Sequence, residues 1–388
     1  MIPYGKQNIS QEDIDSVIEV MNSEFLTQGP ITPKFEKELS NYCNSKYSVA
    51  VVNATSALHI ACLALDVKKG DIVWTSPISF VASSNAALYC DADVDFVDID
   101  ITTYNMSVDS LEEKLIQSEK LGKLPKVVIP VHLAGQSCDM QKIFELSQKF
   151  NFKIIEDASH AIGAEYLNEK VGSCKYSDIT VFSFHPVKII TTCEGGACMT
   201  NDKSIFDKLY RLRSHGIVRN QEDMENISHG SWYYEQIDLG FNYRLNDLQS
   251  ALGLSQLKRI DKFIEQRHEV SNYYFENLKE LDNIILPYQS EHTYSSFHLF
   301  IIRVKGNNSS SRKNLFDKLR NNGIFVNIHY IPIYKHPYYS KRGYKNLENA
   351  EKYYEQAISI PIYPNLKKED LEKIKNVINS NQNFQTLF

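Results

Sequence analysis

The stretch YSVAVVNATSALHIACLALDVKKGDIVW, residues 47–74, contains the repeating unit that decides the fold. Residues 47–52 and 71–74 have the apolar composition of buried β-strands. Thr55 and Ser56 stand where residues that cap a helix are expected. The order strand, short turn, helix, strand is typical of an α/β protein. Between the two strands, apolar residues recur at i, i+3, i+4 and i+7, which defines one face of a helix: Leu58, Ala61, Cys62 and Leu65.

The same alternation continues through the first half of the chain. It predicts an α/β domain whose mostly parallel sheet is covered by helices on both faces. Parallel strands bring their carboxyl ends to one edge of the sheet, which is where open α/β sheets bind their ligands. Four further strand-like runs support this prediction: residues 94–97, 126–131, 153–156 and 178–184.

The second half of the chain has a different pattern. Residues 245–281 are almost free of Gly and Pro and have helical apolar spacing, which predicts one long helix. We therefore expect a large domain over residues 1–245, with its segment 1–30 near the substrate site. The long helix and a small α+β unit would form residues 246–388. Within that unit we expect a strand at 296–304, a helix at 310–323, a strand at 324–334, and a loop followed by a helix at 336–354.

Composition excludes several classes of protein. The net charge is −6 over 388 residues without a basic block, so we expect no nucleic-acid partner. The chain has neither a signal-like start nor an apolar run of about 18 residues, which indicates a cytoplasmic protein without a membrane partner. The seven cysteines are an odd number without a CxxC pair, which favours reduced and mostly buried thiols. No HExxH, GxGxxG or GxxxxGK[ST] motif is present, so we expect no metal site.

A lysine and an aspartate follow two of the predicted strands. Lys188 lies in VFSFHPVKIITTCEGG, residues 181–196, where burial would lower the pKa of its amine and make it a nucleophile. A solvated lysine after a strand is the ordinary alternative. Asp157 comes directly after strand 153–156, at the same expected edge. Pyridoxal 5′-phosphate needs this pair, a lysine to hold its aldehyde as an imine and a carboxylate against its ring nitrogen.

Other residues suit the rest of such a cofactor. Thr55 and Ser56 at a helix start, with Ser183 nearby, are candidates for binding a phosphate, although simple helix capping explains the first two equally well. Phe80 could cover a cofactor face or pack in the core. His160 could contact the cofactor's phenolic oxygen or be a hydrogen-bonded core histidine.

Four segments together resemble the sugar-nucleotide aminotransferase family of pyridoxal-phosphate enzymes, and they occur in the same order over nearly the whole chain. The resemblance implies an aspartate-aminotransferase-like fold (fold type I). It also implies pyridoxal 5′-phosphate as cofactor, pyridoxamine 5′-phosphate as its intermediate form, and a homodimer with active sites shared between subunits. The segments are NATSALHIACLAL (53–65), EDASHAIGAEY (156–166), SFHPVKIITTCEGGA (183–197) and GFNYRLNDLQSALGLSQL (240–257).

The resemblance assigns cofactor roles by position. Lys188 is the imine lysine, and Asp157 is the partner of the pyridine nitrogen. Phe80 lies against the ring. The implied phosphate contacts are Thr55, Ser56 and Ser183.

Three further assignments are less complete. Asn242 matches the residue that reaches the phosphate of the other subunit's cofactor, although a turn asparagine before a helix is the plain alternative. Many members carry glutamine where this chain has His160. The residues that bind the carboxylate of the amino donor are open, with Arg244 and Arg219 as candidates.

Within the family, residues 25–30, 75–90, 185–192 and 327–334 most resemble the branch that serves pseudaminic acid biosynthesis. That likeness implies UDP-2-acetamido-2,6-dideoxy-β-L-arabino-hexos-4-ulose, a UDP-4-keto sugar, as acceptor and L-glutamate as donor. Without it, 25–30 would be an ordinary turn and 327–334 an ordinary strand. The implied substrate contacts are Tyr4, Leu26, Thr27, Gln28, Gly29, Ser56, His329 and Tyr330.

Three alternatives stay open on the sequence. The chain could aminate another nucleotide 4-keto sugar, because such sugars differ by only a few groups. It could be a cofactor-dependent sugar dehydratase, although that branch of the family has histidine in place of Lys188. It could also be a non-catalytic relative that binds cofactor or sugar. The intact lysine favours transamination.

Overall fold

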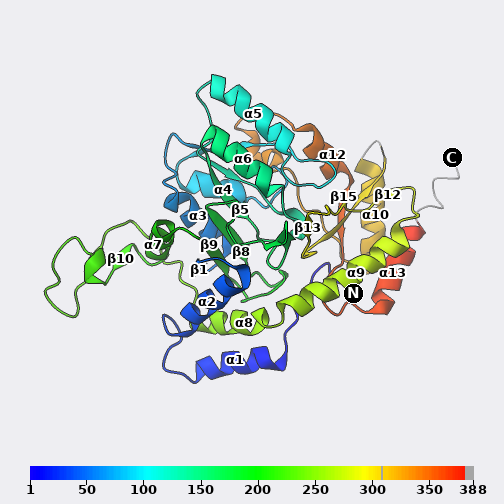
Figure 1. Ribbon diagram of the computed structural model, residues 1–388. Coiled ribbons are helices and arrows are strands. Elements are labelled where there is room, and N and C mark those ends of the chain that lie inside the picture. Colours follow the sequence, from blue (N-terminus) through cyan, green and yellow to red (C-terminus); the bar gives the residue numbers. More distant parts are fainter. Residues whose placement is uncertain (307–308, 381–388) are drawn as a thin grey trace.

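A mixed sheet forms the centre of the molecule (Figure 1). The computed structural model describes residues 1–306 and 309–380, and within them seven strands adjoin in the order β1-β9-β8-β5-β4-β2-β3. All are parallel except β9, which runs antiparallel to both its neighbours. The predicted α/β architecture and its first six strands are confirmed. The bounds are β1 (Tyr47–Val51), β2 (Ile72–Thr75), β3 (Asp93–Phe96), β4 (Val127–Ile129), β5 (Lys153–Asp157), β8 (Ile179–Ser183) and β9 (Gly196–Thr200).

Helices cover both faces of this sheet (Figure 1). The helices fall into three groups, according to the hydrophobic cluster to which each contributes. Because neighbouring strand residues point to opposite faces, Val127 packs against the first group, whereas Val128 packs against the third group on the other face. The first group is α3 (Ala54–Ala64), α4 (Ala82–Tyr89) and α7 (Lys203–Leu212). On the opposite face, the second group is α2 (Ile31–Cys43) and α8 (Asp247–Leu257), and the third is α5 (Val108–Lys120) and α6 (Met140–Phe150).

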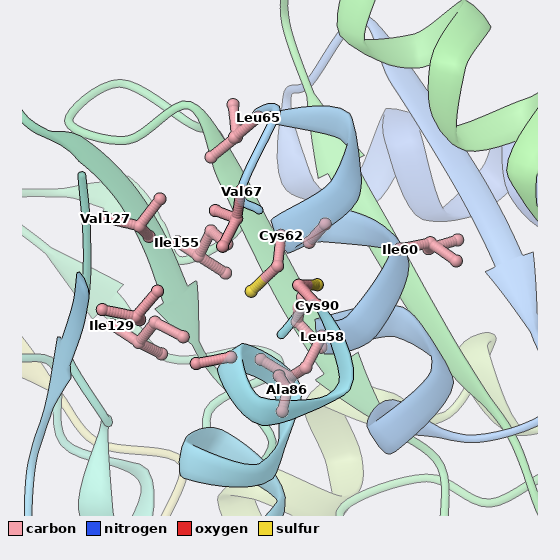
Figure 2. Close-up of a cluster of buried hydrophobic side chains, with 14 of the residues drawn as sticks. Leu58, Ile60, Cys62, Leu65, Val67, Ala86, Cys90, Val127, Ile129 and Ile155 are labelled. Atoms are coloured by element: carbon pink, nitrogen blue, oxygen red, sulfur yellow. The ribbon is translucent and has the colours of Figure 1, made fainter. Parts of the chain in front are cut away.

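The core under α3 explains why the quoted stretch folds as it does. Figure 2 shows Leu58 and Cys62 of α3 facing Val127, Ile129 and Ile155 of the sheet. Each of these side chains is at most 1% exposed, and burying one such aliphatic side chain contributes about 1.5–3 kcal/mol. All seven cysteines are free and all but Cys193 are buried, as predicted.

A smaller sheet lies beside the first. Its strand order is β12-β14-β15, and a separate hydrophobic cluster packs it against α9, α10 and α13. Ile2, at the start of the chain, also belongs to this cluster. The expected unit 246–388 includes residues 307–308 and 381–388, which lie outside the described residues. The bounds are β12 (Ile284–Ile285), β14 (Phe300–Val304), β15 (Ala357–Ile360), α9 (Ile260–Leu278), α10 (Ser309–Asn321) and α13 (Lys368–Asn379).

The remaining elements connect or border these two sheets. Among the described residues, no helix is both long and apolar enough to cross a membrane. The remaining helices are α1 (Gln11–Met21), α11 (Pro337–Ser340), α12 (Glu348–Gln356) and the 3₁₀ turns η1 (Leu133–Gly135), η2 (Gln221–Asp223) and η3 (Ile333–Lys335). The remaining strands are β6 (Glu165–Tyr166), β7 (Glu169–Lys170), β10 (Ile217–Val218), β11 (Glu235–Gln236) and β13 (Thr293–Tyr294).

The prediction of one long helix over 245–281 is wrong. The chain forms α8 and α9 instead, with a break at Arg259, whose backbone is not helical (φ −113°, ψ 6°). The Arg259 guanidinium is 2.5 Å from the buried carboxylate of Asp13 and also contacts Asn8. The break between α8 and α9 thus coincides with a charge-assisted hydrogen bond from Arg259 to Asp13, near the start of the chain. Local helix propensity does not predict such a break.

The prediction of a strand over 324–334 is also wrong. This segment makes only isolated bridges, Ile324 with Ile2 and Asn327 with Ser359, and then forms η3. Pro332 lacks an N–H group for a strand ladder. The segment is therefore an irregular wall between the two sheets.

The predicted cap of α3 is wrong by two residues. Asn53 is the N-cap, and its side chain accepts a hydrogen bond from Ser56 N (2.8 Å), so Thr55 and Ser56 lie in the first helical turn. Gly196 of β9 passes directly beneath this turn. A Cβ atom at Gly196 would lie 2.6 Å from Ala54 N and from the carbonyl carbon of Asn53. The position of the helix start therefore depends on a residue without a side chain.

We predict that Gly196→Ala destabilises the protein by roughly 1–3 kcal/mol, because the new methyl group must push backbone rather than a flexible side chain. The measurement is the unfolding midpoint in a thermal or denaturant scan. Gly5→Ala is the matched control, since its Cβ would meet only Val187 at an ordinary 3.5 Å. An unchanged midpoint for Gly196→Ala would show that β9 and α3 have more room than the structure indicates.

Candidate active site

A cavity of about 500 Å³ opens at the edge where β5 and β8 end and α3 begins. The ends of parallel strands therefore form it, as expected for an open α/β sheet. Nine of the residues singled out on sequence line it: Tyr4, Thr55, Phe80, Asp157, His160, Ser183, Lys188, His329 and Tyr330.

Asp157, the last residue of β5, presents a buried carboxylate at the cavity (4% exposed). Its Oδ2 accepts a hydrogen bond from Ser83 Oγ (2.6 Å), and its Oδ1 accepts one from Ser159 Oγ (2.6 Å). The backbone N–H of Ser159 also donates to Oδ1 (3.2 Å). Donors of this kind stabilise a negative charge and hold the carboxylate in one orientation.

Lys188 lies in a turn after β8, where its backbone N–H donates to the His185 carbonyl (2.9 Å). The Lys188 side chain is half-buried and lines the cavity. Burial lowers the pKa of this amine to about 8, and the nearby charge of Asp157 only partly opposes that shift. An amine with this pKa is a better nucleophile near neutral pH than an ordinary lysine.

The start of α3 supplies donors for an anion. The first N–H groups of a helix have no partner within the helix. In α3, the N–H group of Ser56 donates to the side chain of Asn53. Ala54 and Thr55, whose N–H groups precede it, both line the cavity, and so does Ser183 from the end of β8. This arrangement of N–H groups and hydroxyls at a helix start suits a phosphate group.

His160 is a neutral hydrogen-bonding group in the cavity wall. Burial, reinforced by the charge of Lys188, lowers its pKa well below the usual value for histidine. Ala134 N donates to His160 Nδ1 (3.3 Å), so the ring proton belongs on Nε2, which faces the hydroxyl of Tyr330 (3.2 Å). Its ring also lies 4.4 Å from that of His298, measured between centroids.

Two aromatic side chains lie across the mouth of the cavity. Phe80 is 59% exposed, so the core-packing alternative for it is wrong. Its ring centroid is 6.3 Å from that of Tyr330. Both nitrogens of His329 are engaged in the wall, Nδ1 with Ser359 Oγ (2.8 Å) and Nε2 with the amide of Asn327 (3.4 Å). Burial lowers the pKa of His329 to about 3, so it is neutral.

The structure does not bring all the singled-out residues to this cavity. Ser56 is buried behind Thr55. Residues 26–29 lie against the start of α8, where Leu26 O accepts from Asp247 N (3.0 Å). Asn242 is exposed and pairs with Ser214 through backbone. The two arginine candidates also lie elsewhere: Arg244 contacts Ser214, and Arg219 lies over the ring of Tyr234.

Several residues that line the cavity were not predicted from the sequence. Ser159 was detectable, because it lies in the same short segment as Asp157 and His160. Ser79 and Asn53 were similarly close to residues already singled out. His298 carried no signal, since it was part of a predicted strand. It is 4% exposed, and among the described residues its Nδ1 has no hydrogen-bond partner.

We predict that Lys188 in the cofactor-free protein reacts with an amine-specific aryl sulfonate as pH rises through about 8, because only the neutral amine is a nucleophile. Ordinary lysines, with a pKa of about 10.4, should need more alkaline solution. The measurement is the labelling of each lysine peptide against pH by mass spectrometry, with exposed Lys262 as the reference. Labelling of Lys188 in parallel with Lys262 would contradict the lowered pKa.

Comparison with known proteins agrees with this site. Residues 7–379 match the DegT/DnrJ/EryC1/StrS aminotransferase family. The UDP-4-amino-4,6-dideoxy-N-acetyl-β-L-altrosamine transaminase of Campylobacter jejuni is 38% identical over 380 residues, which cover 97% of this chain and 96% of that protein.

Two solved structures share the fold over almost their whole length. One is PseC of Helicobacter pylori, an aminotransferase of pseudaminic acid biosynthesis (TM-score 0.90, 32% identity, 98% of each chain). The other is the sugar aminotransferase Spr1654 of Streptococcus pneumoniae in its PLP form (TM-score 0.87, 28% identity, 98% of this chain and 99% of that one). These matches confirm the predicted fold type I architecture. The chain belongs to the DegT/DnrJ/EryC1/StrS aminotransferase family.

Proposed function

We propose that this chain transfers the amino group of L-glutamate to C4 of a UDP-linked 4-keto-6-deoxy-N-acetylhexosamine, using pyridoxal 5′-phosphate. The product would be UDP-4-amino-4,6-dideoxy-N-acetyl-β-L-altrosamine, an intermediate of pseudaminic acid biosynthesis. The observation that carries the proposal is that Lys188 and Asp157 face one cavity, each at the carboxyl end of its strand. The substrate follows from the names of the relatives and from the resemblance of residues 25–30 and 327–334.

The residues of the cavity fit this cofactor. Asp157 is a buried carboxylate whose remaining lone pairs are available on the cavity side, which suits a ring nitrogen that carries a proton. The free N–H groups at the start of α3 suit the phosphate. Val131 and exposed Phe80 offer apolar surface for a flat ring.

The cofactor, when bound, supplies an electron sink for the negative charge that develops at the carbon losing its proton. Asp157 would keep the proton on the ring nitrogen, which that role requires. Lys188 Nζ would take the proton from the α-carbon of glutamate and later return one to C4 of the sugar. His160 would donate its one ring proton to the Tyr330 hydroxyl, and Tyr330 would then donate its own proton to an oxygen of the bound groups.

The intact lysine also supports transamination over sugar dehydration. The dehydratase branch has histidine at this position, and histidine cannot hold the cofactor covalently through an amine. Lys188 has the lowered pKa that such an attachment needs. A dehydratase or a non-catalytic relative is therefore the weaker reading of this site.

We further propose a homodimer with shared sites. Asn242 and Arg244 lie outside the cavity of their own chain, on the segment that leads out of the protruding β10–β11 hairpin (Figure 1). Three large apolar residues of this region are highly exposed: Ile227 (87%), Trp232 (69%) and Leu239 (81%). A second copy would cover such a surface and could bring Asn242 to the phosphate of its partner.

We predict that the visible absorbance band of the cofactor-loaded protein disappears when L-glutamate is added and returns when the correct UDP-4-keto sugar follows. Formation of 2-oxoglutarate in the first step should match the protein in amount. Lys188→Ala should lose turnover, because it removes both the attachment point and the proton carrier, whereas the exposed-lysine control Lys262→Ala should not. Testing sugars of gluco, galacto and altro configuration identifies the acceptor. Near-normal turnover by Lys188→Ala would refute the proposal.

We predict that Lys188→Ala and Asn242→Ala, each impaired alone, regain turnover when the two are refolded together. In a mixed dimer with shared sites, one site receives both defects and the other receives neither. If Asn242 acted only within its own chain, every site would keep one defect and mixing would restore nothing. Turnover after mixing, compared with the sum of the separate variants, distinguishes the two arrangements.

A further inference from the structure

Asp157 is held from behind by a chain of two serine hydroxyls. Ser83, in the first turn of α4, is 0% exposed, and its Oγ lies 2.6 Å from Asp157 Oδ2. Ser79 Oγ lies 2.7 Å from Ser83 Oγ, and Ser79 itself lines the cavity. The segment from the end of β2 to the first turn of α4 therefore contributes to the site twice, with Phe80 in the cavity lining and Ser83 on the carboxylate of Asp157.

The direction of these hydrogen bonds follows from the chemistry of the groups. An ionised carboxylate can only accept, so Ser83 donates its single proton to Asp157. Ser83 can then only accept from Ser79, whose hydroxyl must be the donor. Hydrogen bonds to charged acceptors are the strong ones, and successive donors reinforce one another. Together with Ser159, this chain stabilises the negative charge of Asp157 from the protein side.

The Ser83 hydroxyl does not serve its own helix. Serines near a helix start usually cap it, but the N-cap of α4 is Val81, without a side-chain hydrogen bond. The contact of the Ser83 hydroxyl with a backbone carbonyl, that of Phe80, is long at 3.4 Å. Its neighbour Ser84 is equally buried but points elsewhere, to the hydroxyl of Tyr339 (2.7 Å) and the Val81 carbonyl (3.0 Å).

We propose that Ser83 is a positioning residue of the reaction: its hydrogen bond holds the Asp157 carboxylate in the orientation that keeps the shared proton on the ring nitrogen of the cofactor. A buried acid and a pyridine nitrogen can otherwise share that proton as a neutral pair, which is a weaker electron sink. Each donor to the carboxylate disfavours the neutral pair. The inference rests on the proposed transaminase function.

The test compares Ser83→Ala with Ser84→Ala, both loaded with pyridoxal phosphate labelled with ¹⁵N in the ring. In Ser83→Ala we expect the ring-nitrogen chemical shift to move toward that of unprotonated pyridine. The single-turnover rate with glutamate should fall by about tenfold or more, the loss expected for one hydrogen bond to a charged group. Ser84→Ala should leave both quantities at their wild-type values, although it also removes a buried hydroxyl.

Two outcomes would overturn the inference while leaving the proposed function intact. In the first, the wild-type protein reacts with glutamate, and the Ser83→Ala variant shows the same ring-nitrogen chemical shift and the same single-turnover rate as the wild type. The other is an equal loss in both serine variants, which would reduce the role of Ser83 to general packing. A wild-type protein that neither binds the cofactor nor reacts with glutamate would overturn both proposals.

Discussion

The structure depends on one constraint: an amine and a carboxylate must face the same cavity without neutralising each other in an ion pair. Asp157 meets it by accepting hydrogen bonds from Ser83 and Ser159, which stabilise its charge from the protein side. Lys188 meets it by burial, which lowers its pKa to about 8 and brings its neutral form within reach of physiological pH. Because these donors already engage the carboxylate, Lys188 can serve in the covalent role proposed for it.

The sheet topology makes this arrangement possible. β5 and β8 are adjacent and parallel, so their carboxyl ends deliver Asp157 and the turn with Lys188 to the same edge. Within this seven-stranded sheet, β9 is the antiparallel strand and has a separate role, since its Gly196 lets the start of α3 come close to the sheet. The position of the N–H groups at the start of α3, the proposed phosphate site, is thereby fixed relative to the strands. The backbone positions of Asp157, Lys188 and Gly196 thus determine where the groups of the proposed site lie.

Local apolar patterns in the sequence were sufficient to predict the parts of the site that lie at the ends of strands. The apolar runs before Asp157 and Lys188 place both residues at strand ends, and that alone predicts their meeting. What could not be predicted are contacts between distant segments. Asp157 and Ser83 are 74 positions apart, and the contact of Arg259 with Asp13 at the helix break spans 246. His298, which lies in a bend just before β14, lacked any signal because its place in the cavity depends on distant segments and not on its neighbours in sequence.

One wall of the cavity comes from an irregular segment of the chain. The wall formed by His329 and Tyr330 comes from the segment that was expected to be a strand, and its irregular path is what carries these side chains to the first sheet. A regular strand would have kept pairing with β15 and left the cavity open on that side. In the proposed homodimer, a second copy would cover the exposed apolar residues around the β10–β11 hairpin, which a single chain leaves in contact with water.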